Sequence, residues 1–337
     1  MRLVYAHFGS KIPKHLRLNL IRTSTLFPNH QCILITDQEV PTFQDNITYV
    51  KVVRDKTWDY IDSRLSHPKE FRRNFWFTSL IRFIEVAKFS SESNEKIIHI
   101  ESDVIVSSDL PLDKFENIDT ALAYPIFNRE MGVASILFVN GKMGGEVLFK
   151  ACFQALEKNE ATTDMFILGE IAQLTERNVT VLPSFVQTNN STKESNLELL
   201  EVVTQNIEYF NGIFDGLEIG QYFFGIDSRN HRGIRIFRRP NVYGFLSVAS
   251  AEYVFDNNRE FPYMIGINKS LWPLYSIHIH SKDVRAFKIN NKIFLQKYML
   301  REKWSEGKSF EYKVFLLAVL KSFYRRCVFI HTKLHGD

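Results

Sequence analysis

The pattern of apolar and polar positions predicts short strands that alternate with helices from the start of the chain. Apolar runs at 3–7, 32–35 and 47–53 have the length and composition of strands. Between the first two runs, apolar residues recur at helical spacing over 13–28. Strands that alternate with helices are typical of sheets whose parallel strands are joined by crossover helices. The sequence therefore predicts an α/β fold, a Rossmann-like mixed sheet flanked by helices.

The alternation continues through the middle of the chain. Residues 69–89 carry the apolar stripe of a long amphipathic helix, and Arg82 lies among its apolar positions. We therefore expect Arg82 to point inward. Residues 184–206 are polar and weakly periodic, as in a surface loop. The other predicted elements are strands at 97–100, 104–106, 119–125, 134–140 and 275–280, and helices at 144–156, 163–175, 288–303 and 310–334.

Composition and charge narrow the classes of protein that this sequence can encode. The 337 residues are 45% hydrophobic and 24% charged, as in an ordinary globular protein. The net charge of +4 is too small for a dedicated nucleic-acid binder but suits anionic ligands or an anionic membrane surface. Cys32, Cys152 and Cys327 are far apart and odd in number, so we expect neither a zinc site nor a disulfide framework.

The two ends of the chain bear on its location. The first residues enter a strand directly, without the charged and apolar regions of a secretory signal. No apolar run reaches the ~18–20 residues of a spanning helix. We therefore expect a cytoplasmic protein. The helix at 310–334 combines apolar residues with clustered cations, which fits peripheral contact with the inner face of a membrane. Packing on the domain or in a dimer fits it equally, and the oligomeric state stays open.

Two carboxylates follow the apolar run at 97–100, and they are the first candidate for chemistry. Glu101 and Asp103 are separated by Ser102. Carboxylates at the carboxyl end of a buried parallel strand lie where open α/β sheets bind ligands.

A second candidate lies near the end of the predicted sheet. His278, His280 and Lys282 alternate along one strand, so they share one face. Two imidazoles and an ammonium on one face are costly unless a metal and an anion bind there. Imidazole ligates ions of the Mn²⁺ type together with carboxylate, and lysine binds phosphate as a point charge. A polar strand face with structural histidines is the alternative.

These motifs, in this order, resemble those of GT-A glycosyltransferases. Glu101-Ser-Asp103 is similar to the Asp-x-Asp motif of that family, with glutamate in place of the first aspartate. The glycine-rich segment 211–230 resembles one found in bacterial glycosyltransferases of surface-polysaccharide clusters. The resemblance implies a GT-A-like catalytic domain over 1–285, with an acceptor-side insertion at 184–272, and a helical C-terminal extension over 286–337.

The resemblance also implies a role for each candidate residue. A Mn²⁺ or Mg²⁺ ion would be held by Asp103 and by His278 or His280, with Lys282 on the diphosphate. Glu101 would hold the ribose, or the metal through water. The donor site would include Ala6, His7, Phe8, Arg82, Glu101, Ser102 and Lys282.

The stereochemistry of transfer stays open at this point. An inverting enzyme needs a carboxylate base for the acceptor hydroxyl. Asp164, at a predicted helix start, and Asp215, among the glycines, are the candidates. A retaining enzyme needs no such base, and 132–140 resembles a strand of retaining enzymes in which Asn128 or Asn140 would supply the asparagine.

The predicted function is that of a metal-dependent glycosyltransferase in polysaccharide biosynthesis. It would move a sugar from a nucleotide-diphosphate donor to a glycan or lipid-linked acceptor, with no nucleic-acid partner. Two alternatives are a nucleotidyltransferase built on the same kind of sheet and a non-catalytic carbohydrate-binding protein. The first normally carries a Gly-rich, Arg/Lys-bearing first loop, which residues 8–13 do not match. The glutamate at position 101 keeps the second open.

Overall fold

The structure is a computed structural model of the chain. It describes residues 1–9, 11–39, 46–69, 74–174, 179–188, 197–224, 251–289, 291–292 and 294–296, with the backbone alone at 174, 197 and 222. The predicted helix at 310–334, most of the one at 288–303 and Cys327 therefore lie outside the described residues.

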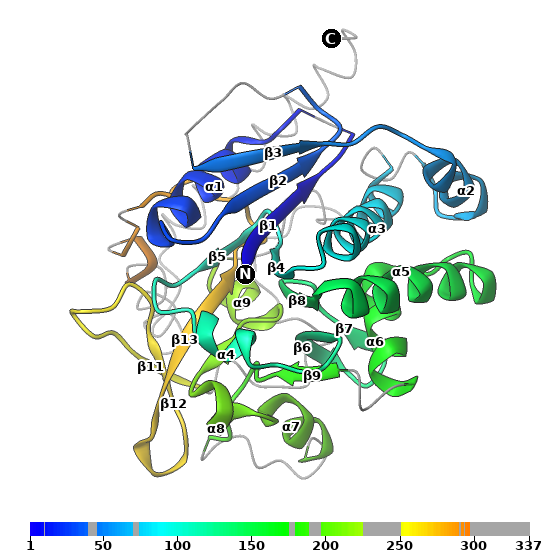
Figure 1. The fold of residues 1–337 in the computed structure, drawn as a ribbon. Coiled ribbons are helices and arrows are strands. Elements are labelled where there is room, and N and C mark those ends of the chain that lie inside the picture. The colour runs from blue at the N-terminus through cyan, green and yellow to red at the C-terminus, as the bar shows by residue number, and fades with distance from the viewer. Residues whose placement is uncertain are drawn as a thin grey trace, which may run out of the picture.

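A mixed sheet forms the centre of the fold, with helices on both faces (Figure 1). Its strand order is β3-β2-β1-β4-β8-β6-β7, and β9 pairs with β6. The first four strands are parallel, whereas β8 runs antiparallel to both β4 and β6. The predicted α/β class with a mixed, helix-flanked sheet is confirmed. The strands are β1 (Arg2–His7), β2 (Cys32–Thr36), β3 (Ile47–Lys51), β4 (Lys96–Ile100), β6 (Leu122–Asn128), β7 (Met131–Gly132), β8 (Ile136–Asn140) and β9 (Val179–Leu182).

Burial on both faces explains why the central strands read as continuous apolar runs. Successive residues of a central strand enter different cores. In β1, Leu3 packs on the side of α1 and Val4 on the side of α3, and in β4, Ile98 packs on the side of α1 and Ile97 on the side of α3. Gly145 allows the helices α3 and α5 to approach closely. A Cβ at this position would lie only 2.5 Å from the Ala87 carbonyl oxygen. The helices of this part are α1 (Lys14–Leu26), α2 (Lys56–Arg64), α3 (Phe75–Ser93), α4 (Leu112–Glu116), α5 (Gly141–Lys158) and α6 (Asp164–Leu174).

A second, smaller sheet lies beside the carboxyl end of β4. Its order is β10-β13-β12-β11, and β5 pairs antiparallel with β13. The strand β5 follows β4 almost at once in the chain, so the chain leaves one sheet and enters the other between them. The elements are β5 (Val104–Val106), β10 (Ile213–Phe214), β11 (Glu252–Val254), β12 (Tyr263–Ile265) and β13 (Leu271–His278), with helices α7 (Leu197–Thr204), α8 (Ile207–Phe210), α9 (Glu218–Phe224) and a 3₁₀ turn at Ile267–Lys269.

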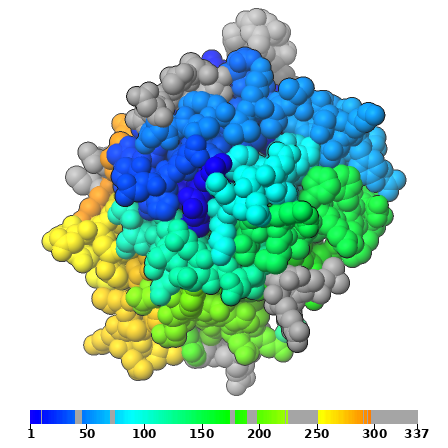
Figure 2. Space-filling view, viewed as in Figure 1, coloured from blue at the N-terminus to red at the C-terminus, as the bar shows by residue number. Residues whose placement is uncertain are grey.

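The space-filling view shows how the two halves of the chain share the surface. Elements from the first part of the chain, in blue, form the upper part of this face, and the yellow β11–β12 region projects at the lower left (Figure 2). None of the described helices combines the length and the apolarity that crossing a bilayer requires. Cys32 and Cys152 are buried thiols without a disulfide partner.

Most predicted elements appear within a few residues of their expected bounds. The surface loop expected at 184–206 is wrong in part, because it contains α7, whose Leu199, Leu200 and Val203 are buried. The helix expected at 69–89 begins at Phe75, directly after Asn74 in the left-handed region, with φ of +66°. The strand expected at 275–280 begins at Leu271 and ends at His278. The short helix α2 was not predicted, although Asp55 caps it by accepting the backbone N–H of Thr57. The predicted domain boundary at 285 stays a prediction.

Candidate active site

The pairing of β5 with β13 brings the two predicted motifs together. Val104 lies opposite His278 in the antiparallel register. One residue further out, the Ile279 backbone N–H donates to the Asp103 carbonyl oxygen over 2.7 Å. The carboxylates that follow β4, His278 at the end of β13 and His280 just beyond it therefore share one edge of the molecule.

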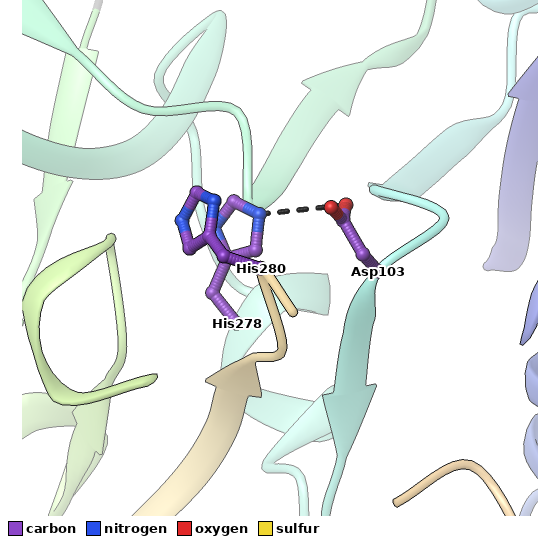
Figure 3. A group of neighbouring side chains, drawn as sticks. All are labelled: Asp103, His278 and His280. Carbon is purple, nitrogen blue, oxygen red and sulfur yellow. Dashed lines mark ion pairs between the residues drawn. The ribbon is translucent and has the colours of Figure 1, made fainter. Parts of the chain in front are cut away.

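Asp103, His278 and His280 form a compact group of side chains (Figure 3). The two imidazole rings stack with 3.8 Å between their centroids, beside the Asp103 carboxylate. The His278 Nε2 lies 3.4 Å from Asp103 Oδ1, and the Lys282 Nζ lies 3.4 Å from Asp103 Oδ2. One nitrogen or oxygen from each member of the group lies within 4.8 Å of the others. These residues converge, but not as alternate positions of one strand, because β13 ends at His278 and a turn carries His280 and Lys282.

Neighbouring charges outweigh burial in setting the pKa values of Asp103 and His278. Burial raises the pKa of Asp103, but the charges of Lys282 and His278 outweigh it and hold that pKa well below its usual range. Burial lowers the pKa of His278, but Asp103, with smaller contributions from Glu101 and Asp215, raises it to about 9. Without a bound cation, His278 is therefore protonated at neutral pH. Cation binding there would release that proton.

The donor set fits a divalent cation of the Mn²⁺ type. It offers one carboxylate and two imidazoles, a mixture that suits such ions. The Nδ1–H of His278 donates to the Gly216 carbonyl oxygen over 3.2 Å, so its Nε2 is the nitrogen left to face the carboxylates. A metal-ligating histidine is usually oriented in this way, by a hydrogen bond from the N–H of its other ring nitrogen.

Arg82 joins the other two acidic candidates. Its Nη1 lies 2.7 Å from Glu101 Oε1, and its Nη2 lies 2.8 Å from Asp164 Oδ2. As expected, Arg82 points inward. Burial raises the pKa of Asp164, and the Arg82 charge only partly opposes this. Glu101 is thus held by arginine on one side, while its other oxygen lies 3.6 Å from His278 Nε2. This position fits a supporting role for Glu101 better than that of a main ligand.

The structure encloses Asp215 among backbone donors. Its side chain is 1% exposed. Its two oxygens accept the backbone N–H groups of Ile219, Gly220 and His278. These three donors occupy the carboxylate, which leaves it badly placed to take a proton from an acceptor hydroxyl.

The predicted nucleotide-binding residues lie at and beside the carboxyl end of β1. Ala6 and Phe8 are buried, and the Phe8 ring packs edge-on against Trp58 at 5.4 Å. His7 and Ser102 are partly exposed. Their role in binding the base and ribose stays a prediction.

One supporting residue was missed from the sequence. Asn19, fully buried in α1, donates from Nδ2 to the Val104 carbonyl oxygen over 2.6 Å and to that of Ser102 over 3.4 Å. It thereby anchors the turn that carries Asp103. The available signal was an asparagine next to Leu20, among the apolar positions of a predicted helix.

His99, fully buried in β4, should make stability depend on pH. Burial, followed by the Arg82 charge, lowers its pKa to about 3, while its Nδ1–H donates to the Val4 carbonyl oxygen. An unfolded histidine has a pKa of ~6.5, so between pH 6.5 and 3 the unfolded chain binds more protons. Stability from this group is therefore lost as the pH falls through that window, about 2 kcal/mol between pH 7 and 5.

The test is urea unfolding at both pH values. His99→Gln should lose less stability than the unmutated protein between pH 7 and 5, by about 2 kcal/mol. His30→Gln, which removes a partly exposed histidine, serves as the control and should leave the pH dependence unchanged. Equal losses in the His99→Gln variant and the unmutated protein would contradict the assignment.

Comparison with known proteins gives matches among solved structures alone. No protein-family model and no curated protein matches this chain. The galactosyltransferase LgtC, in complex with donor and acceptor sugar analogues, is 14% identical, with 62% of this chain and 81% of that chain covered and a TM-score of 0.42. GlyE of Streptococcus pneumoniae is 17% identical, with coverage of 54% and 45% and a TM-score of 0.36. Mouse xyloside xylosyltransferase 1 is 8% identical, with coverage of 60% and 93% and a TM-score of 0.39. All three are glycosyltransferases.

Proposed function

We propose that this chain is a divalent-metal-dependent glycosyltransferase that moves a sugar from a nucleotide-diphosphate donor to a glycan or lipid-linked acceptor. The observation that carries the proposal is the convergence of Asp103, His278, His280 and Lys282 at the carboxyl end of β4. Two segments far apart in sequence supply a cation site and an adjacent ammonium group. That combination suits a diphosphate leaving group.

Each group at this edge has a chemical task in such a reaction. Asp103, His278 and His280 would hold Mn²⁺ or Mg²⁺. The bound cation would neutralise negative charge on the departing diphosphate. Lys282 contributes a second positive charge beside Asp103, and its ammonium can bind a phosphate oxygen once a donor enters. When the sugar leaves, the terminal phosphate of the diphosphate gains a second negative charge, which the cation and Lys282 would both stabilise.

Arg82 and its two carboxylates form the side of the site that we assign to the donor sugar. The guanidinium keeps Glu101 and Asp164 in fixed positions through one contact each. Asp164 is the carboxylate that we assign to the acceptor hydroxyl if transfer inverts the anomeric centre, because Arg82 holds it beside Glu101 and burial raises its pKa. Retention would need no such base. The acceptor would approach past the segment 211–224, whose continuation at 225–230 lies outside the described residues.

A thermal-shift screen of nucleotide sugars tests this function. A cognate donor at about 100 times its Kd, with Mn²⁺, stabilises the folded state by about 2.7 kcal/mol. We expect the Tm to rise by about 4 °C or more. EDTA should abolish the shift, and Asp103→Ala should not show it. Release of a nucleoside diphosphate then marks a glycosyltransferase, whereas release of pyrophosphate marks a nucleotidyltransferase. If no nucleotide sugar shifts the Tm with Mn²⁺, the proposal is wrong.

A further inference from the structure

A turn directly behind the two imidazoles is tied to them by several hydrogen bonds. It runs from Asp215 to Gln221 and comprises the connection that follows β10 together with the first residues of α9. The Asp215 Oδ2 accepts the backbone N–H of His278 over 2.9 Å and that of Gly220 over 2.7 Å. Its Oδ1 accepts the Ile219 N–H over 3.1 Å. One carboxylate thus holds the turn against the end of β13.

The burial of Asp215 is costly, and this cost calls for a physical reason. A carboxylate that is 1% exposed normally pairs with a cationic side chain. Among the described residues, no lysine or arginine forms an ion pair with Asp215, and the cationic partner that lowers its pKa is the imidazole of His278. The segment also packs closely against β13, since a Cβ at Gly220 would lie 1.9 Å from the His278 carbonyl oxygen. These features fix the distance between the turn and His278.

The same turn presents a hydrogen-bonding group to each ring. The Gly216 carbonyl accepts the Nδ1–H of His278 over 3.2 Å, which fixes the tautomer with Nε2 facing Asp103. The Gln221 side-chain Nε2 lies 3.4 Å from the Nε2 of His280. A carboxamide can present oxygen or nitrogen in this place, since its two ends are nearly isosteric. If the carboxamide turns to present its oxygen instead, the His280 Nε2 carries the proton and donates it to that oxygen.

We propose that the turn from Asp215 to Gln221 positions both imidazoles of the cation site, with Asp215 and Gln221 as positioning residues. This inference rests on the proposed function, because it takes the cation site as real. It assigns Asp215 to the orientation of His278 rather than to proton transfer. Gln221 acts in the same way on His280.

Asp215→Asn tests the first half of the inference. Asparagine keeps the size of the side chain but replaces one acceptor oxygen by an NH₂ group that opposes a backbone donor. We expect Mn²⁺ affinity, measured with MnCl₂ alone by electron paramagnetic resonance of the free ion, to fall 10–100-fold. The matched control is Asp55→Asn, in which a carboxylate that caps α2 is changed away from the site. It should bind Mn²⁺ as the unmutated protein does.

Gln221→Ala and Gln221→Glu test the second half, with little risk to folding because this side chain is partly exposed. Gln221→Ala should weaken Mn²⁺ binding and change the visible absorption of bound Co²⁺, which reports ligand geometry. Gln221→Glu keeps an acceptor for the His280 Nε2–H and should restore both. A general loss of stability would not alter the Co²⁺ spectrum of the folded fraction. It would also not be reversed by Gln221→Glu.

The outcomes separate this inference from the proposed function. If the unmutated protein binds no Mn²⁺, the cation site is wrong and this inference fails with it. If the unmutated protein binds Mn²⁺ and both Asp215→Asn and Gln221→Ala bind it equally well, the positioning role alone is wrong. Should Asp215→Asn fail to fold, the two Gln221 variants decide the matter.

Discussion

Replacing Asp103 by alanine is expected to lower sugar transfer on the order of a thousandfold. Asp103 is the one carboxylate that lies within 3.4 Å of both His278 and Lys282 among the described residues. Its removal takes away the anionic member of the proposed cation site and leaves two cationic groups as neighbours. Release of nucleoside diphosphate from the donor identified by thermal shift, at saturating Mn²⁺, measures the effect.

The control for this prediction is Asp109→Ala. Asp109 lies beyond the other end of β5 and pairs with Arg259, so its loss removes a carboxylate without touching the site. It should retain most of the transfer rate. His280→Ala should resemble Asp103→Ala, because it removes a second member of the same group. Unchanged turnover in the Asp103→Ala variant would show that the cation assignment is wrong.

Replacing Arg82 by methionine is expected to destabilise the protein by about 3–5 kcal/mol. Arg82 bridges Glu101 and Asp164, and all three side chains are at most 16% exposed. Without the guanidinium, two carboxylates would lie close together, out of water and uncompensated. The transfer rate should fall as well, since both carboxylates lose their fixed positions. Urea unfolding at neutral pH measures the stability.

A triple mutant separates charge from packing. Arg82→Met combined with Glu101→Gln and Asp164→Asn should recover much of the lost stability, because no unpaired carboxylate remains. Arg54 gives a matched control: it also contacts two carboxylates, Asp59 and Asp62, but is 49% exposed. Arg54→Met should cost no more than about 1 kcal/mol. A similar cost at Arg82 would mean that water already screens the buried bridge.

The sequence was informative about the side chains because the chemistry of a site restricts residue types. Asp103, His278, His280 and Lys282 stand out as polar groups at the ends of apolar runs. The structure brings these four together. By contrast, Asp164 and Asp215 looked equivalent as candidates. One faces a guanidinium and the other three backbone N–H groups, a difference that depends on neighbours distant in the chain.

The positions of the central strands were predictable because strands buried on both faces are apolar at most positions. β1, β2 and β4 therefore appear within one residue of the expected bounds. Only the tertiary structure decided that the chain leaves the central sheet after β4 and that β5 pairs with β13. Local patterns fix which residues face a core, but the choice of partner strand depends on packing between segments far apart in the chain. That choice places Asp103 beside His278, and with it the candidate site.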